Sequence, residues 1–251
     1  MYSEHQPDLR LTPLVEVYWI ASGYVDCRKS FGILPDGCVD IVFSFGDMSA
    51  ENGLKKYYPN IAGTMTSVFD VIFEKQVQMF GIRFKPAAIT AFTRVPVENF
   101  TNRRVDMTLV ETLFDKQFYE TLPEKKSAEQ IIGYMNNYLL AKRSSIFQID
   151  SQILYSIDLI NKSNGMLAIA TLASEVCIVQ RHFERRFKKS TGISPKTFAK
   201  IVKLKNAIKQ MKNNSQKNLF SIAIDCGYYD HNHMIKDFHA LTGNSPAHFR
   251  Y

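Results

Sequence analysis

Two short stretches in the second half of the chain place hydrogen-bonding side chains on what would be one face of a helix. Side chains three or four positions apart are neighbours on an α-helix. Guanidinium, amide and carboxylate groups are the donors and acceptors that pair with base edges in the major groove of DNA. The candidate base-reading residues are Gln180, Arg181, Glu184 and Arg185 in the first stretch and His231, Asn232, His233 and Lys236 in the second.

Both stretches belong to an internal repeat. The segment His182–Phe198 recurs as His233–Phe249, with His, Phe, Thr, Gly, Ser, Pro and Phe at matching positions. Further upstream, Leu172–Ala173 matches Ile222–Ala223. Each copy predicts a short helix, a tight turn, a second helix and then the sequence Thr-Gly-x-Ser-Pro. In that sequence glycine permits a left-handed helix cap and proline can start the next helix.

This order of elements is typical of a helix-turn-helix unit, in which two short helices pack at a steep angle. Small residues, Ala173 and Ala223, allow the two helices of each copy to approach closely. Bulky Phe187 and Phe238 can fill the space between them. The polar face of the second helix is then free to enter a major groove.

A long helix is predicted between the copies, from about Pro195 to Lys212. At 1.5 Å per residue it would be roughly 27 Å long. That length can hold two reading helices about one duplex turn, roughly 34 Å, apart on one face of DNA. One chain could then read two adjacent major-groove segments.

The charge distribution agrees with a polyanionic partner. The chain carries a net charge of +7, but residues 151–251 contain 15 Lys/Arg and 6 Asp/Glu, a net of +9, whereas residues 1–150 carry a net of −2. Such an asymmetry is expected of a nucleic-acid-binding module joined to a neutral one. The candidate phosphate contacts are Lys188, Lys189, Lys196 and Arg250.

On these motifs, residues 151–251 resemble the DNA-binding domain of the AraC/XylS family of bacterial transcription regulators. The resemblance implies double-stranded DNA and RNA polymerase as partners, and it assigns base reading to the eight residues named above. Cys177 stands where the family often has glycine in the first turn. The segments Leu34–Ile41 and Gly81–Pro86 resemble, less specifically, an N-terminal domain found in some members.

The overall fold class predicted is multi-domain. The N-terminal part, residues 1–143, is expected to be α+β, with an antiparallel sheet or barrel followed by helices, and the C-terminal part, residues 150–251, to be all-α with two helix-turn-helix subdomains. β-branched and aromatic runs between turn residues indicate the strands; helical apolar spacing indicates the helices. The strands expected are Val15–Ile20, Cys38–Phe45, Ile61–Thr66, Val68–Phe73 and Val77–Phe84, and the helices of the first part are Ala87–Phe92, Thr108–Tyr119 and Ser127–Arg143.

The N-terminal domain is expected to sense a signal or to oligomerise. One hypothesis is a small-molecule effector bound in an apolar cavity lined by aromatic residues. An alternative is a protein-interaction or homodimerisation module without a ligand; an enzyme fused to a DNA reader is a third, disfavoured class. The candidate lining residues of the effector pocket are Trp19, Phe43, Phe45, Phe73, Phe80 and Phe84.

Several classes of protein are disfavoured by what the sequence lacks. His5 is the one histidine of the first half, whereas a metal-dependent barrel enzyme needs two or three to hold its metal. No glycine-rich phosphate loop or nucleophile turn is found, so neither a cofactor nor a metal site is predicted. No stretch has the length of a membrane span and the N-terminus does not look like a signal peptide. We therefore expect a cytoplasmic protein that is not an enzyme.

Overall fold

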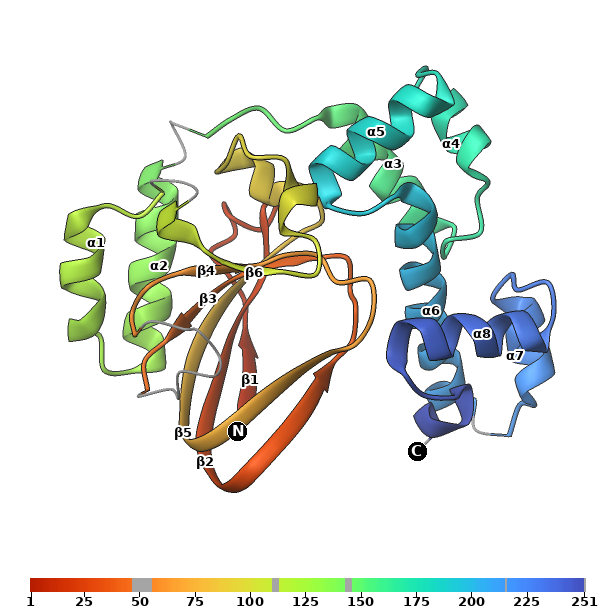
Figure 1. Cartoon of the computed structure of the whole chain (residues 1–251). Helices are drawn as coiled ribbons and strands as arrows, with labels where there is room; N and C mark the ends of the chain where they lie inside the picture. Colours follow the sequence, from red (N-terminus) through yellow and green to blue (C-terminus); the bar gives the residue numbers. More distant parts are fainter. Residues whose placement is uncertain (47–55, 110–112, 143–145, 215, 251) are drawn as a thin grey trace.

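A single antiparallel sheet forms the N-terminal part of the protein (Figure 1). The structure is a computed structural model that describes residues 1–46, 56–109, 113–142, 146–214 and 216–250. The sheet has six strands in the order β1-β2-β5-β3-β4-β6. Their bounds are Tyr2–His5 (β1), Val15–Ile33 (β2), Val39–Ser44 (β3), Asn60–Ala62 (β4), Phe69–Phe84 (β5) and Arg104–Asp106 (β6).

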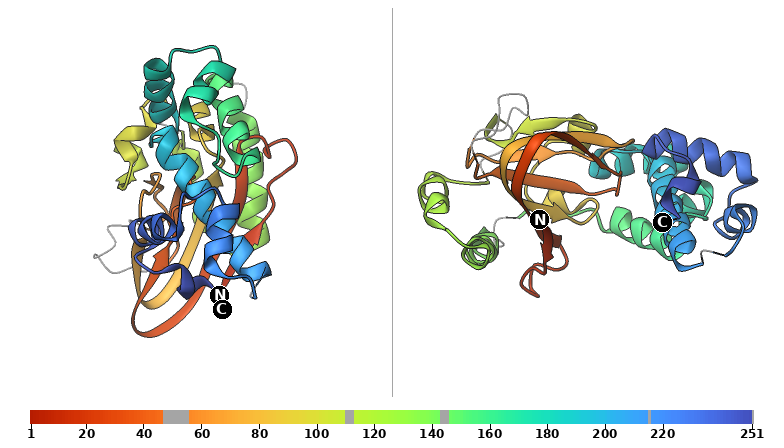
Figure 2. Two further views of the ribbon diagram at one scale, coloured as in Figure 1. Left: turned by 90° about the vertical axis from the view of Figure 1, so that its right-hand side faces the viewer. Right: turned by 90° about the horizontal axis from the view of Figure 1, so that it is seen from below.

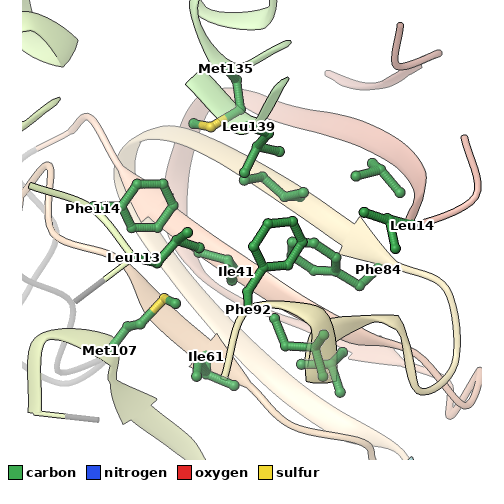
Figure 3. Packing of buried hydrophobic residues seen from close by; sticks show 14 of the residues in the cluster. Leu14, Ile41, Ile61, Phe84, Phe92, Met107, Leu113, Phe114, Met135 and Leu139 are labelled. Carbon is green, nitrogen blue, oxygen red and sulfur yellow. The ribbon is translucent and has the colours of Figure 1, made fainter. Parts of the chain in front are cut away.

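One face of the sheet carries the core of this domain. Ile41 on β3 and Phe84 on β5 are fully buried there, and Met135 and Leu139 of helix α2 pack over them (Figure 3). Side chains two positions apart on a strand point to the same face, so the apolar residues at alternate positions of β3 and β5 share this core. Helices α1 (Lys116–Thr121) and α2 (Ala128–Lys142) cover it, together with short 3-10 turns after β5.

The opposite face is shaped by the long strands β2 and β5, which pair along nearly their whole length. Their register shifts between Val25 and Lys29, a bulge that strengthens the local bend of the pair. Figure 1 shows both strands curling away from the rest of the sheet toward their far ends. A second apolar cluster, which contains Trp19 and Met79, lies on this side.

The remainder of the chain is helical among the residues described. The helices are α3 (Ser151–Lys162), α4 (Ile169–Glu175), α5 (Gln180–Thr191), α6 (Pro195–Asn213), α7 (Leu219–Asp225) and α8 (His231–Thr242), followed by the 3-10 turn Pro246–Phe249. The fold class predicted from the sequence is confirmed: an antiparallel sheet with helices, then a helical region with two helix-turn-helix units.

The element bounds differ from the sequence prediction in the sheet. The segments 68–73 and 77–84 form one strand, β5, because no turn residue separates them, and most of the predicted strand 61–66 is loop. The short strands β1 and β6 were not predicted. The predicted helix 108–119 is a 3-10 turn at Met107–Leu109 and then α1, and its residues 110–112 lie outside the described residues.

Figure 2 shows how the layers are arranged. The helices α1 and α2 lie at one side of the sheet, and the helical C-terminal half lies at the other. Segment 146–150 passes along the N-terminal domain before α3 begins, and Phe147 N donates to the Ala91 carbonyl at 2.8 Å.

Candidate nucleic-acid interface

The two copies of the repeat fold in the same way. In each copy the second helix, α5 or α8, ends at a glycine in the left-handed conformation, Gly192 (φ 87°) or Gly243 (φ 71°). The preceding threonine donates its hydroxyl back to the helix: Thr191 to the Phe187 carbonyl at 2.9 Å and Thr242 to that of Phe238 at 2.8 Å. The Thr-Gly pair is therefore the helix stop that the sequence predicted.

The turns between the helices of each copy also match, with one difference. The turn of copy two uses Gly227 at φ 73°, and the turn of copy one uses Cys177 at φ 53°. A non-glycine residue there is in a backbone region that side chains other than Asn and Asp rarely adopt. Cys177 is exposed, so its side chain extends into solvent without contacting the core.

Helix α6 joins the two copies and is fixed to copy two by polar contacts. Lys200 Nζ lies 2.7 Å from Oδ1 of Asp237, a carboxylate on α8 whose side chain is 7% exposed. Lys203 Nζ donates to the Gly227 carbonyl at 2.8 Å. These lysines hold α7 and α8 on the connecting helix, so copy two is set at a defined place along it.

The predicted base-reading side chains lie on exposed faces of α5 and α8. In α5, Glu184 is half-buried and accepts a hydrogen bond from Gln180 Nε2 at 2.8 Å. In α8, His233 lies edge-on against the Tyr228 ring, and its backbone NH is capped by Asp230. The exposed members of the set are Gln180, Arg181, Arg185, Asn232, His233 and Lys236, and the half-buried ones are Glu184 and His231.

The basic residues around these helices divide into two groups. Lys189 and Lys196 are exposed and form no ion pair with the residues that the structure describes, so both could contact a phosphate. Arg186 instead forms a two-pronged ion pair with Asp150 at 2.7–2.9 Å, which ties α5 to the start of α3. Arg250 donates to the Lys217 carbonyl and is half-buried, so part of its side chain is already used within copy two.

A cavity of about 770 Å³ lies on the curled face of the N-terminal sheet. The indole ring of Trp19 forms part of its wall and lies flat over Gly81, where an added Cβ would be 2.0 Å from the ring. Tyr2 stacks on this indole with ring centroids 6.3 Å apart. The cavity exists because glycine leaves room for the indole and because the bent strands β2 and β5 extend past the other strands.

Of the six aromatic residues predicted to line an effector pocket, Trp19 and Phe73 line this cavity. The other four lie on the core side of the sheet. Strand residues alternate between the two faces, and the pairing register determines which of them face the core. Those four are Phe43, Phe45, Phe80 and Phe84. The charged residues of the cavity wall were not predicted, because their position depends on strand pairing.

The polar part of the cavity wall is an ion cluster around Arg83. Its Nε lies 3.3 Å from an Asp36 oxygen and 3.2 Å from an Asp40 oxygen, and Trp19 Nε1 donates to Asp40 at 2.9 Å. Burial raises the pKa of Asp40 to about 6, although the Arg83 guanidinium and the hydrogen bonds oppose this. These acidic groups of the wall are therefore already partnered.

Comparison with protein families gives two matches. Residues 172–251 match the family described as "Helix-turn-helix domain". This span contains both copies of the repeat and α6. The C-terminal half is an AraC-type helix-turn-helix domain. Residues 3–106, which include all six strands, match the family described as "Domain of unknown function (DUF6597)".

A solved structure with the same overall arrangement comes from a bacterial protein. ToxT from Vibrio cholerae aligns over 93% of this chain and 97% of its own, with a TM-score of 0.50 and 9% sequence identity. The C-terminal domain of AraT, a response regulator from Geobacillus stearothermophilus, aligns with 41% of this chain and 87% of its own, at a TM-score of 0.38 and 19% identity. No curated protein matches the chain. The AraC-type domain makes the protein a DNA-binding transcription regulator.

The N-terminal domain holds the AraC-type domain at the carboxyl end of α5. Thr64 Oγ1 donates to the Thr191 carbonyl at 2.6 Å, and Thr101 Oγ1 donates to the Gly192 carbonyl at 2.5 Å. Glu98 pairs with Lys188 of α5 at 3.5 Å. We call these three contacts the clamp.

The clamp is specific to copy one of the AraC-type domain. At the matching glycine of copy two, Gly243, the nearest contact from the N-terminal domain is an ordinary one, 3.8 Å between an added Cβ and Val68 Cγ1. Because the clamp holds the carboxyl end of α5, the amino-terminal half of that helix, which carries its four candidate base readers, points away from the N-terminal domain (Figure 1). At its carboxyl end the same face of α5 carries Lys188, which the clamp holds through Glu98.

Within the described residues, no helix combines the length and apolar character needed to cross a membrane.

Proposed function

We propose that the chain reads two adjacent major-groove segments of DNA, one with α5 and one with α8. The observation that carries this proposal is that both helices present exposed hydrogen-bonding side chains and are joined through one continuous helix. α6 has 19 residues. At 1.5 Å per residue it is about 28 Å long, close to the roughly 34 Å between successive major grooves on one face of DNA.

The base readers proposed are the eight residues of α5 and α8. Arg181 and Arg185 are suited to guanine O6 and N7, and Asn232 to adenine N6 and N7. Lys188, Lys189 and Lys196 are proposed to contact phosphates, which position the domain without reading sequence. Arg250 can join them only with the part of its guanidinium that Lys217 leaves free.

Selection of bound sequences from a random duplex pool, followed by two variants, tests this proposal. Arg185→Ala should lose discrimination at one or two base positions, at a cost of about 1–3 kcal/mol. Lys189→Ala should weaken all sequences alike and reduce the salt dependence of binding by about one phosphate contact. If Arg185→Ala retained the full sequence preference of the parent, α5 would not be a base reader.

The second part of the proposal is that a small molecule bound in the cavity controls DNA binding. The loops that form the clamp also form the cavity wall: Gly63 and Met65 flank Thr64, and Asn102 follows Thr101. Asn102 N donates to the Thr64 carbonyl at 3.1 Å, so the two loops are joined by a backbone hydrogen bond. A ligand that shifts them would act directly on the end of α5.

Thermal-shift screening of the full chain against apolar compounds tests effector control. A compound that raises the unfolding temperature of the parent should have no effect on Ala62→Phe, which places a ring in the cavity. A compound that stabilises both proteins alike binds elsewhere. If no compound binds in the cavity, the alternative hypothesis is favoured. In that case the N-terminal domain contacts another protein without a ligand, either RNA polymerase or a second copy of this chain.

We further propose that the functional division of the chain falls between residues 143 and 150, with residues 1–143 as the regulatory domain and 150–251 as the DNA-binding domain. Asp150 supports this division, since it caps α3 and binds Arg186, both within the second domain.

A further inference from the structure

Two arginines of the cavity wall, Arg103 and Arg104, form no ion pair among the residues that the structure describes; Arg103 is exposed to solvent, whereas Arg104 is half-buried. Arg104, on the edge strand β6, stacks on Phe69 with its guanidinium carbon 5.5 Å from the ring centroid. It forms no ion pair with any residue that the structure describes, and its Nε is buried without a hydrogen-bond partner. Burial lowers the pKa of Arg104, and no carboxylate offsets this effect.

Strand pairing explains why Arg104 has no acidic neighbour. Arg83 lies opposite Asp40, Asp40 opposite Ala62, and Ala62 opposite Arg104. Residues directly opposite in a sheet share a face, so these four form one row across the cavity wall. Arg83 and Asp40 neutralise each other, whereas the neighbour of Arg104 is an alanine that has no polar atom. No strand lies beyond β6 in the sheet order.

The rest of the wall is mostly apolar. Around the row, the cavity is lined by the Trp19 indole and by Val42, Val71 and Met79. Its carboxylates are occupied: Asp36 accepts from the Cys38 NH at 2.9 Å and pairs with Arg83, and Asp40 binds both Arg83 and Trp19. An unpaired, half-buried cation in an apolar wall of this size, with the exposed Arg103 beside it, complements a ligand that has an apolar body and an anionic group.

We infer that the effector is an apolar organic anion, a carboxylate, sulfonate or similar group on an aromatic or aliphatic body, whose charge binds Arg104. This inference rests on the proposed effector cavity and names its ligand class. Such a contact would be a charge-assisted hydrogen bond, which is stronger than a neutral one and which the planar guanidinium can make in two-pronged form. Binding would also give the buried Nε of Arg104 a hydrogen-bond partner.

A pair of dyes that differ in one group tests the inference. 8-Anilino-1-naphthalenesulfonate carries a sulfonate, and N-phenyl-1-naphthylamine is the same molecule without it. Both fluoresce on entering an apolar site, and energy transfer from Trp19, the one tryptophan of the chain, reports binding near the cavity. The full-length parent should bind the anionic dye more tightly than the neutral one.

Two arginine variants complete the design. Arg104→Gln should weaken the anionic dye at least about tenfold, as expected for loss of a charged hydrogen bond, and leave the neutral dye unchanged. Arg94→Gln is the matched control: Arg94 also stacks on a phenylalanine, at 4.6 Å from the Phe147 centroid, but does not line the cavity. It should change neither affinity by more than about twofold. Retained binding of the neutral dye shows that Arg104→Gln is folded.

The outcomes separate the inference from the proposed function. If both dyes bind but the anionic one is indifferent to Arg104→Gln, or if both weaken equally, the ligand class is wrong and the effector cavity stands. If neither dye transfers energy from Trp19, the effector cavity itself is refuted, and the ligand class with it.

Discussion

The ion pair between Glu98 and Lys188 sets a measurable limit on DNA binding. Lys188 lies on the same face of α5 as Arg181, Glu184 and Arg185, so binding to a phosphate requires it to leave Glu98. The pair is exposed, with 55% of the Lys188 side chain and 35% of the Glu98 side chain accessible, and its charged atoms are 3.5 Å apart. Exposed pairs contribute about 0.2–1 kcal/mol. Glu98→Gln should therefore tighten DNA binding about 1.4- to 5-fold.

Fluorescence anisotropy with a selected duplex at several salt concentrations measures this effect. Lys188→Gln should reduce the slope of log affinity against log salt by about 0.9, the value for one phosphate contact. In that background Glu98→Gln should have no further effect. Glu120→Gln controls for the loss of one negative charge, because Glu120 forms a similar exposed pair, 3.6 Å from Lys116, on α1.

Two results would refute the reasoning. If Glu98→Gln and Glu120→Gln raise the affinity equally, the gain comes from net charge and not from release of Lys188. If Glu98→Gln still tightens binding when Lys188 is glutamine, Glu98 opposes DNA by another route.

Three further predictions concern the cavity and the turns. Gly81→Ala should cost about 1–3 kcal/mol of unfolding free energy, because the new methyl group overlaps the Trp19 indole, and it should shift the Trp19 emission spectrum. Gly227→Ala should cost about 1–2 kcal/mol in denaturant unfolding, since φ there is 73°; Cys177→Ala, at the matching turn, should stay within about 0.5 kcal/mol. The pKa of Asp40 is about 6 in the folded protein and 3.8 for an unperturbed carboxyl. The folded state thus binds this proton more tightly, and its contribution to stability should grow as the pH falls from about 7 to about 4. Asp40→Asn should lack this gain in urea midpoints measured over that range, and a parallel pH profile for the two proteins would contradict the assignment.

The helical half of the protein was predictable because its signals are local. Thr-Gly-x-Ser-Pro stops one helix and starts the next within five residues, and the repeat shows the pattern twice. The exposed face of α5 follows from the spacing of Phe183 and Phe187, which are both fully buried. Here the sequence predicts both the elements and the candidate site.

The cavity was only partly predictable because it depends on contacts between distant strands. Trp19 and Phe43 have the same aromatic character, yet the pairing register puts one in the cavity wall and the other in the core. Arg104 has no motif around it; its isolation becomes visible only once β6 pairs with β4. The clamp is likewise invisible in the sequence, since Thr64 and Thr101 are ordinary loop residues until they meet the end of α5.

The clamp gives the protein a direction along the DNA that the repeat alone would not provide. Two helix-turn-helix units of the same fold in tandem could be expected to treat the two halves of a DNA site as equivalents. Thr64, Thr101 and Glu98 hold copy one and, among the described residues, make no matching contacts with copy two. The N-terminal domain is therefore held by the unit that we propose reads one defined half. Reversing the site on the DNA would then carry the N-terminal domain to the other flank, so the orientation of a binding site, and not only its position, would decide what the regulator faces.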